Sequence, residues 1–366
     1  MRAGLISLAL ILLLGCTHTP ESQGLYVSRD TGLAEPKLQY LGVGGWLMHW
    51  RGEGFVIGPS FSNPATLGLL GLPPITVRPN EPRIDRYMPL APDVTMLLVG
   101  HAHYDHLLDV PRVMQIQTPN AKVYGSETVG HILRASRSDR DPRPLVDPRR
   151  IVVPADDQIA PVGVPDYRGT WFYSSGERLQ DGDDPARLPN GRPKGTIRAM
   201  PVASMHAGHI LRHNFLPGAY DNDLEEAPTY IRGWKLGHHT LAWIIDLLGP
   251  DGLPVYRIHF QDSAARPPFG FPPVLADRKG FDLEILCAAS WNQVDYYPGG
   301  LLRVTRPRLV VLGHWENFFG NDPGQHARTI PLLRYDGLIE NIRRAGYGSR
   351  YKVLEPLTEI ALPGVE

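Results

Sequence analysis

Three histidines and an aspartate stand within six consecutive residues of this chain: His101, His103, Asp105 and His106. Neutral imidazole and carboxylate groups are ligands that suit Zn²⁺, Fe²⁺ or Mn²⁺. On an extended loop, alternate residues can direct two imidazole rings at one ion, while the Asp-His pair that follows turns toward a second ion. The string therefore indicates metal binding, and the alternative is a solvated polar loop.

The residues around this cluster predict the elements that position it. Residues 94–99 form an apolar run that only Thr95 interrupts and Gly100 closes, the pattern of a strand buried on both faces. We therefore expect the cluster in a loop at the end of a core strand. A helix is predicted over 107–117, where Pro111 is tolerated only near the first turn.

The string His-Ala-His-Tyr-Asp-His resembles the His-x-His-x-Asp-His signature of the metallo-β-lactamase superfamily. The resemblance implies an α/β fold, a four-layer αββα sandwich of two mixed β-sheets with loop insertions. It also implies two metal ions, with His101 and His103 at the first and Asp105 and His106 at the second. Zinc is the expected metal, with iron or manganese as alternatives. Asp105 would also help to position or deprotonate the attacking water.

The same resemblance implies that further ligands follow later strands. The strand predicted over 197–205 ends at His206, where the family places its third first-site histidine, and His209 is the nearest competitor. The strand predicted over 255–260 ends in Phe-Gln-Asp-Ser, which is similar to the family's Phe-x-Gly-Asp-Thr turn. Asp262 would then bridge the two ions, and its alternative is a turn or N-cap residue.

A last ligand is implied near the C-terminal end. The buried-strand pattern over 309–312 is followed by Gly313 and His314, where the family has a second-site histidine. An Asp at position 262, where the zinc β-lactamases commonly have a Cys, argues against that group. Two ions about 3.5–4 Å apart lower the pKa of a shared water, so the resemblance implies a hydrolase that uses a metal-bridging water.

The local strings Tyr104-Asp105-His106 and His314-Trp315 are most similar to the branch that contains N-acylphosphatidylethanolamine-hydrolysing phospholipase D and ascorbate-phosphate lactonases. Phosphodiester substrates, including lipid-derived ones, are therefore expected. Hydrolysis of a lactone, amide or thioester, and a non-catalytic metal-binding surface lipoprotein, are the two alternatives. The chain departs from this branch at Val43, where relatives have His, and at Gly58, where they have Asp.

The first sixteen residues predict export and membrane anchoring. Arg2 precedes an apolar stretch over 5–14 that is too short to span a bilayer. It ends in Leu-Leu-Gly-Cys, which resembles the bacterial lipobox and marks Cys16 for lipidation. We expect a lipoprotein signal peptide over 1–16, a tether over 17–35, and one hydrolase domain over 36–366 in the cell envelope.

The formal net charge of −1 gives no electrostatic reason to expect a nucleic-acid partner. The remaining partner classes are a small-molecule or lipid substrate and the membrane itself. Cys287 lies in an apolar run and is expected to be a buried, inert thiol.

Apolar and turn patterns predict the rest of the domain. Hairpins are expected over 37–57 and 241–260, with buried strands over 281–289 and 309–312. Residues 136–196 are rich in Pro, Asp, Arg and Gly and predict inserted loops. A helix is predicted over 335–345 and a closing strand over 351–362. The insertion 207–239 directly follows His206 and is either a solvated loop or a substrate lid.

Overall fold

The computed structural model describes residues 18–364, apart from 66–72, 139–140, 181–183, 185–186, 189–190, 192 and 210. The predicted signal peptide and Cys16 lie outside the described residues. None of the helices in the described ranges is long and apolar enough to span a bilayer.

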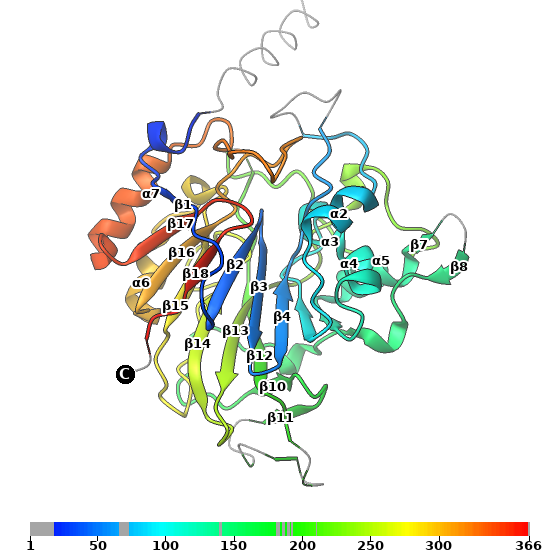
Figure 1. Cartoon of the computed structure of the whole chain (residues 1–366), viewed down its shortest axis with the longest axis horizontal. Helices are drawn as coiled ribbons and strands as arrows, with labels where there is room; N and C mark the ends of the chain where they lie inside the picture. The colour runs from blue at the N-terminus through cyan, green and yellow to red at the C-terminus, as the bar shows by residue number, and fades with distance from the viewer. Residues whose placement is uncertain are drawn as a thin grey trace, which may run out of the picture.

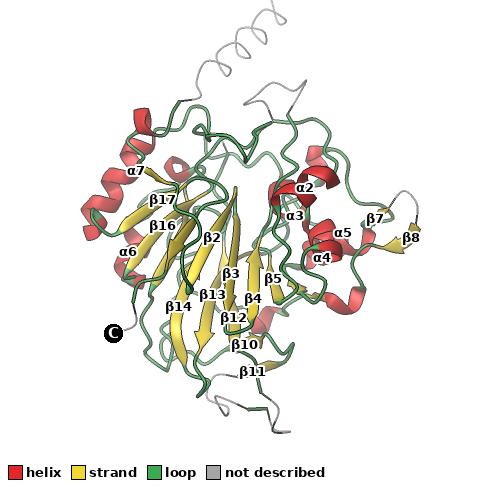
Figure 2. Ribbon diagram, in the orientation of Figure 1, coloured by secondary structure: helices red, strands yellow, loops and turns green. Residues whose placement is uncertain are grey.

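Two mixed β-sheets face each other across a shared core (Figures 1 and 2). Parallel and antiparallel neighbours occur in both sheets. The larger sheet has the order β1 (Val27–Ser28), β17 (Tyr351–Leu354), β16 (Leu309–Gly313), β15 (Leu283–Cys287), β14 (Pro254–Phe260), β13 (Thr240–Leu248), β12 (Ile197–Ser204), β10 (Thr170–Tyr173) and β11 (Arg178–Gln180). The smaller sheet has the order β18 (Glu359–Ala361), β2 (Lys37–Gly42), β3 (Gly45–Trp50), β4 (Glu53–Ile57), β5 (Val94–Leu98), β6 (Lys122–Tyr124) and β9 (Ile151–Val152).

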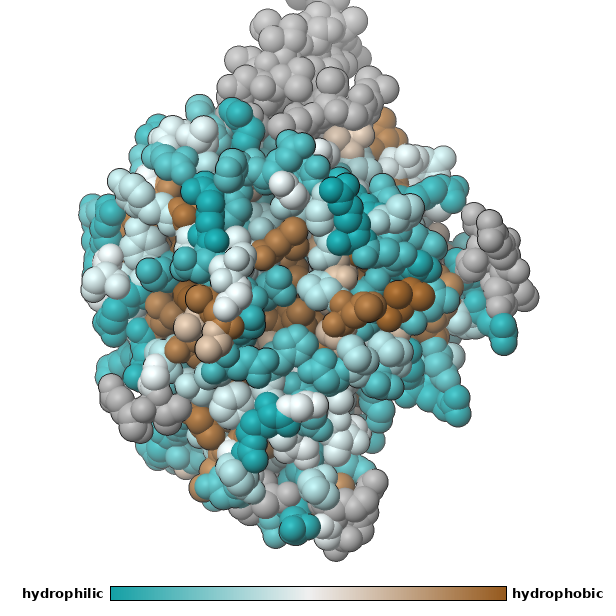
Figure 3. All heavy atoms as spheres, in the orientation of Figure 1, coloured by the Kyte–Doolittle hydropathy of each residue, from teal (hydrophilic) through white to brown (hydrophobic). Residues whose placement is uncertain are grey.

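Helices cover the outer faces of the sheets, as Figure 2 shows. Beside the larger sheet lie α6 (Gly299–Thr305) and α7 (Tyr335–Ile342), and beside the smaller sheet lie α2 (Glu81–Tyr87), α4 (Val110–Ile116) and α5 (Glu127–Ala135). A short hairpin of β7 (Arg137–Ser138) and β8 (Asp141–Pro144) projects from this side. The fold class is the predicted αββα sandwich. Its surface is mainly hydrophilic on the face seen in Figure 3, where apolar groups gather in limited patches.

Alternation along the strands explains why both faces of the smaller sheet are buried. Phe55 and Ile57 of β4 point into the core between the sheets, whereas Val56 packs with the helix layer. On β5, Leu98 lies in the first core and Leu97 in the second. This period of two is the geometry of a strand, and it accounts for the continuous apolar run that predicts β5.

The expected hairpins are confirmed by β2–β4 and by β13–β14, and the expected buried strands by β15 and β16. Two predictions about strands are wrong. The insertion 136–196 contains β10, whose four residues are all buried and whose Phe172 and Tyr173 pair with β12. The closing segment 351–362 is two strands in different sheets, because the chain leaves β17 at Glu355-Pro356 and crosses to pair β18 with β2.

Two element boundaries also differ from the expected ones. The predicted helix over 107–117 begins at Val110, and Asp105 and His106 instead lie in a separate helical turn, α3 (Tyr104–Leu107). The segment 18–35 carries the 3₁₀ turn η1 (Glu21–Gln23) and strand β1, and Leu25 is fully buried in the core. Ordered structure therefore begins before Pro36.

Strand direction decides where the site lies. β12 and β14 are both antiparallel to β13 and so run the same way, and β14, β15 and β16 are parallel. Their carboxyl ends therefore meet at one edge of the larger sheet. We call this edge, together with the loops that leave it and the facing loop after β5, the site edge.

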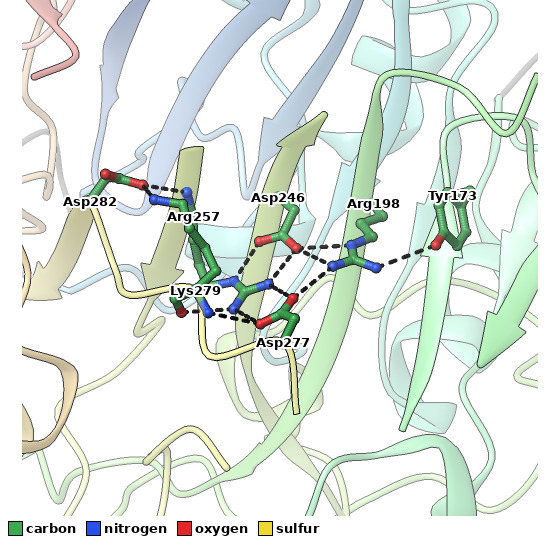
Figure 4. A network of polar contacts seen from close by, with 7 residues as sticks. All are labelled: Tyr173, Arg198, Asp246, Arg257, Asp277, Lys279 and Asp282. Carbon is green, nitrogen blue, oxygen red and sulfur yellow. Dashed lines mark hydrogen bonds and ion pairs between the residues drawn. The ribbon is translucent and has the colours of Figure 1, made fainter. Parts of the chain in front are cut away.

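An ionic network on the outer face of the larger sheet supports the strands that reach this edge (Figure 4). Arg198, Asp246 and Arg257 are register partners on β12, β13 and β14. Asp246 accepts hydrogen bonds from Arg198 Nε at 2.8 Å and from Arg257 Nε at 2.7 Å. Asp277, from the loop after β14, accepts from Arg257 Nη2 at 2.7 Å. The network therefore joins three strands and one loop by charge-assisted hydrogen bonds.

Candidate metal centre

All seven side chains proposed as ligands from the sequence converge at the site edge. They form three overlapping groups in which one nitrogen or oxygen from each residue lies within 4.8 Å of the others. The groups are His101, His103 and His206; His101, His106 and Asp262; and Asp105, His106 and His314.

The first group follows strands β5 and β12. His101 Nε2 and His103 Nδ1 are 3.1 Å apart, and the His206 ring centroid lies 4.7 Å from each of their centroids. Burial lowers the pKa of His101 to about 3 and that of His103 and His206 well below the usual value. These imidazoles are therefore neutral, the form that coordinates a metal.

Hydrogen bonds orient two of these rings from outside the group. His206 Nδ1 donates to the Ala207 carbonyl at 2.5 Å, and His103 Nε2 donates to the Leu216 carbonyl at 3.2 Å. Each ring thus keeps one nitrogen free to face the group. Such outer partners fix the tautomer and direction of metal-binding histidines.

Asp262, which directly follows β14 and Gln261, lies between a histidine of each predicted site. Its Oδ2 is 2.5 Å from His101 Nδ1, and its Oδ1 is 3.2 Å from His106 Nδ1. The carboxylate fits closely against Gly100, where an added Cβ would lie 2.3 Å from Asp262. A glycine at the end of β5 is therefore required for this approach, whether the carboxylate bridges two ions or orients the rings.

The remaining group joins α3 to the end of β16. Asp105 Oδ2 lies 3.4 Å from His314 Nε2 and 3.7 Å from His106 Nε2. Burial by itself lowers the pKa of His106, but the charges of Asp262 and Asp105 outweigh it and raise the value to about 9. Positive charge beside these carboxylates is therefore favoured.

The donor set fits two divalent ions. His314 Nδ1 is buried without a hydrogen-bond partner among the described residues. Buried polar atoms are seldom left unpaired in proteins unless a ligand, ion or water completes them. The set comprises five histidines and two carboxylates, one of which is shared. These nitrogen and oxygen ligands match the chemistry of zinc, iron or manganese.

His209, the competing histidine, also lies beside the first group. Its ring centroid is 5.0 Å from that of His206 and 5.6 Å from that of His103. Its Nδ1 accepts a hydrogen bond from the Phe215 backbone N–H at 3.2 Å. Because that nitrogen is engaged with its own loop, His209 is better placed as a wall of the site than as one of the three grouped ligands.

A buried pair that sequence reasoning missed, Tyr40 and Glu316, positions one end of the site. The His314 backbone N–H donates to Tyr40 Oη at 2.8 Å, and Tyr40 Oη donates to Glu316 Oε2 at 2.6 Å. The other carboxylate oxygen accepts from the Val43 N–H. Val43 and His314 both have positive φ, 54° and 55°, a conformation that is unfavourable for residues other than glycine.

The pair therefore holds two strained residues in place. One is His314, and the other is Val43 in the loop 42–44. In this loop Gly44 lies so close to His106 that an added Cβ would be 2.6 Å from its ring. The sequence signal was an acidic residue two positions after His314. Its meaning depends on Tyr40, which is distant in sequence.

Glu316→Gln is expected to weaken metal binding by about tenfold or more, because outer partners of metal-site groups typically contribute that much. The loss should fall on the ion near His314 and spare the ion near His206. Metal titration of the purified chain, with retained ions counted by mass spectrometry, measures this.

Glu284→Gln is the matched control, since Glu284 is equally buried and hydrogen-bonded to His259 on β14, away from the grouped ligands. Equal metal affinity in both variants would contradict a positioning role for Glu316.

The insertion 207–239 lies against the site and is anchored in the fold. Its Leu216 carbonyl contacts His103, and its Leu236 carbonyl accepts from the Ala102 N–H at 3.2 Å. Trp234 is buried in the core beneath the helix layer. Phe215, by contrast, is more than half exposed. The insertion is therefore a packed wall of the site with exposed apolar side chains, and its role as a lid stays a prediction.

Cys287 is buried at the end of β15. Burial and the nearby Asp262 carboxylate raise the pKa of its thiol well above the usual range. The expectation of an inert thiol is in agreement with these surroundings.

No protein-family model and no curated protein matches the sequence. Among solved structures, the chain is similar to Igni18, a metallo hydrolase from Ignicoccus hospitalis, with 15% identity and a TM-score of 0.42 over 88% of this chain and 97% of that one. It is also similar to isothiocyanate hydrolase from Delia radicum gut bacteria, with 11% identity and a TM-score of 0.45 over 90% and 100%. A third is the metallo-β-lactamase fold protein YhfI from Bacillus subtilis, with 11% identity and a TM-score of 0.42 over 88% and 98%. Likeness at this level carries no conclusion about substrate.

Proposed function

We propose that this chain is a dinuclear metal-dependent hydrolase that attacks its substrate with a water held between two ions. The observation that carries the proposal is the convergence of seven candidate ligands from four separate strand ends into three overlapping groups. Bound ions of this kind lower the pKa of a shared water toward neutrality and stabilise negative charge that develops on the attacked centre.

The protein's own residues have distinct roles in this proposal. Asp105, buried beside His314, would help to position or deprotonate the attacking water. Asp262 lies between His101 and His106 and orients each ring with one carboxylate oxygen. The Leu216 and Ala207 carbonyls keep their histidines in the tautomer that faces the ions.

We further propose phosphodiester substrates, including lipid-derived ones, and an exported chain anchored through lipidated Cys16. The support for the substrate class is the likeness of Tyr104-Asp105-His106 and His314-Trp315 to phospholipase-type relatives. The support for the anchor is the Leu-Leu-Gly-Cys end of the leader.

Metal analysis tests the dinuclear site directly. The purified chain, loaded with zinc and then desalted, is expected to retain about two ions, the occupancy that a two-metal site requires. His206→Ala should reduce this to about one, because it removes a ligand of the first group only. The exposed His213 lies in the same loop outside the groups, so His213→Ala should retain both ions.

Hydrolysis of a phosphodiester, a phosphomonoester, a lactone and a thioester by the loaded chain then tests the substrate class. Turnover of the lactone or thioester alone would reject the phosphodiester assignment and leave the metal site intact. Retention of less than half an ion per chain, about a quarter of what a two-metal site holds, would reject the hydrolase proposal itself.

A further inference from the structure

The described chain begins at the site edge. The His18 carbonyl accepts a hydrogen bond from the Thr329 N–H at 3.0 Å. Thr329 pairs in turn with Glu316, two residues after His314. Figure 1 shows the start of the described chain (blue) and the loop after β16 (orange) at the same end of the molecule. The chain therefore enters the fold beside the candidate metal centre.

Cys16 precedes His18 by only two residues. Two extended residues span at most about 7 Å, since each adds roughly 3.3–3.6 Å. An acyl chain on Cys16 would therefore start within that distance of the loop after β16. An anchor at Cys16 would therefore hold the domain at its site edge.

Exposed apolar side chains gather on the loops of the same edge. Each of them is more than half exposed. Each lies on a loop that follows the carboxyl end of a site-edge strand or of β4, which is parallel to β5, or on the insertion packed against the site. They are Ile75 after β4, Leu211, Phe215 and Tyr230 after β12, Tyr296 after β15, and Leu332 after β16.

Contacts join several of these side chains to one another and to the site. The Phe215 ring centroid lies 5.7 Å from that of His209, which stacks in turn beside His206. Arg212 forms an ion pair with Asp295 at 2.8 Å, so the segments that carry Leu211 and Tyr296 lie side by side. Exposed apolar groups that lie together beside a candidate site mark a surface for an apolar partner.

We propose that the site edge faces the bilayer that holds the Cys16 anchor, with these apolar side chains in the interfacial layer, and that the substrate is an amphiphile taken from that bilayer. The orientation rests on the proposed anchor, and the substrate class deepens the proposed function. Apolar side chains in the interfacial layer would add buried apolar surface to the acyl anchor on Cys16. The occupant of this surface is thus a lipid bilayer.

Nitroxide labels on the full, lipidated chain test the orientation in vesicles of phosphatidylethanolamine and phosphatidylglycerol. Leu332→Cys and Tyr296→Cys place labels on the site edge, outside the grouped ligands. Leu253→Cys, in the β13–β14 hairpin, and Val304→Cys, in α6, are controls at the opposite edge, and both positions are more than half exposed. Native Cys287 is buried and is not expected to label.

Labels at 332 and 296 are expected to collide more often with lipid-soluble oxygen than with a water-soluble nickel chelate. Labels at 253 and 304 are expected to collide more often with the nickel chelate. Cys16→Ser should lose flotation with the vesicles. The proposal is overturned if all four labels report the same aqueous exposure, or if the wild-type chain fails to float. Protection of 332 and 296 without vesicles would instead assign the surface to a protein. Metal content and hydrolysis in detergent are measured separately, so a failure of the hydrolase proposal can be told apart from a failure of the membrane orientation.

Discussion

Asp262→Asn is expected to reduce hydrolysis by the metal-loaded chain by about a hundredfold or more, because several kcal/mol of transition-state stabilisation depend on a correctly held two-metal site. Asn has nearly the same shape but no negative charge. It can no longer balance His106 and His101, which lie 3.2 Å and 2.5 Å from the carboxylate oxygens. We expect retention of fewer than two ions per chain.

A kinetic assay with counted metal checks this prediction. Asp277→Asn is a suitable control, because Asp277 is hydrogen-bonded to Arg257 on the outer face of the same sheet and contacts none of the grouped ligands. If Asp262→Asn kept both ions and full activity, the residue would be a turn residue only. The ligand set would then have to be redrawn around another carboxylate.

Asp246→Ala is expected to lower the free energy of unfolding by about 3–5 kcal/mol, because removing one partner of a buried ion pair leaves the other charge uncompensated. Asp246 and Arg257 are fully buried, and Arg198 is nearly so. Both guanidinium groups donate to this one carboxylate. Chemical denaturation followed by circular dichroism measures the loss.

Asp336→Ala is the matched surface control. Asp336 pairs with Arg334 in solvent, and exposed pairs contribute less than about 1 kcal/mol. The folded Asp246→Ala chain should still retain its metal ions, since the network lies on the outer face of the sheet. Equal stability of the two variants would contradict the structural role of the network.

The surroundings of the site explain which of its parts could be predicted from sequence. His101, His103, Asp105 and His106 are local, because one strand end and one helical turn place all four. Their pattern was therefore readable without the fold. His206, Asp262 and His314 were placed by resemblance, each at the end of an apolar run. Strand direction in the larger sheet then brings these three ends to one edge.

Other features depend on contacts that no local pattern carries. Thr170–Tyr173 lies between turn-rich segments, and only its pairing with β12 makes it a strand of the larger sheet. The closing segment forms two strands because β16 and β2 offer free edges in different sheets. Glu316 gains its role from Tyr40, and the two buried residues that meet there are 276 positions apart in sequence.

Sequence alone determined the local histidine and aspartate cluster at 101–106 and the hairpins, because these depend on residue types and on short periodic patterns that act within one element. The class of the fold and the three distant ligands followed from the resemblance of that cluster to a known family. The tertiary structure decided the rest: which distant side chains share a group, which backbone segments hold strained residues, and where the chain enters relative to the site. Those are distances between elements, and they arise only when the two sheets pack and exclude water from the core between them.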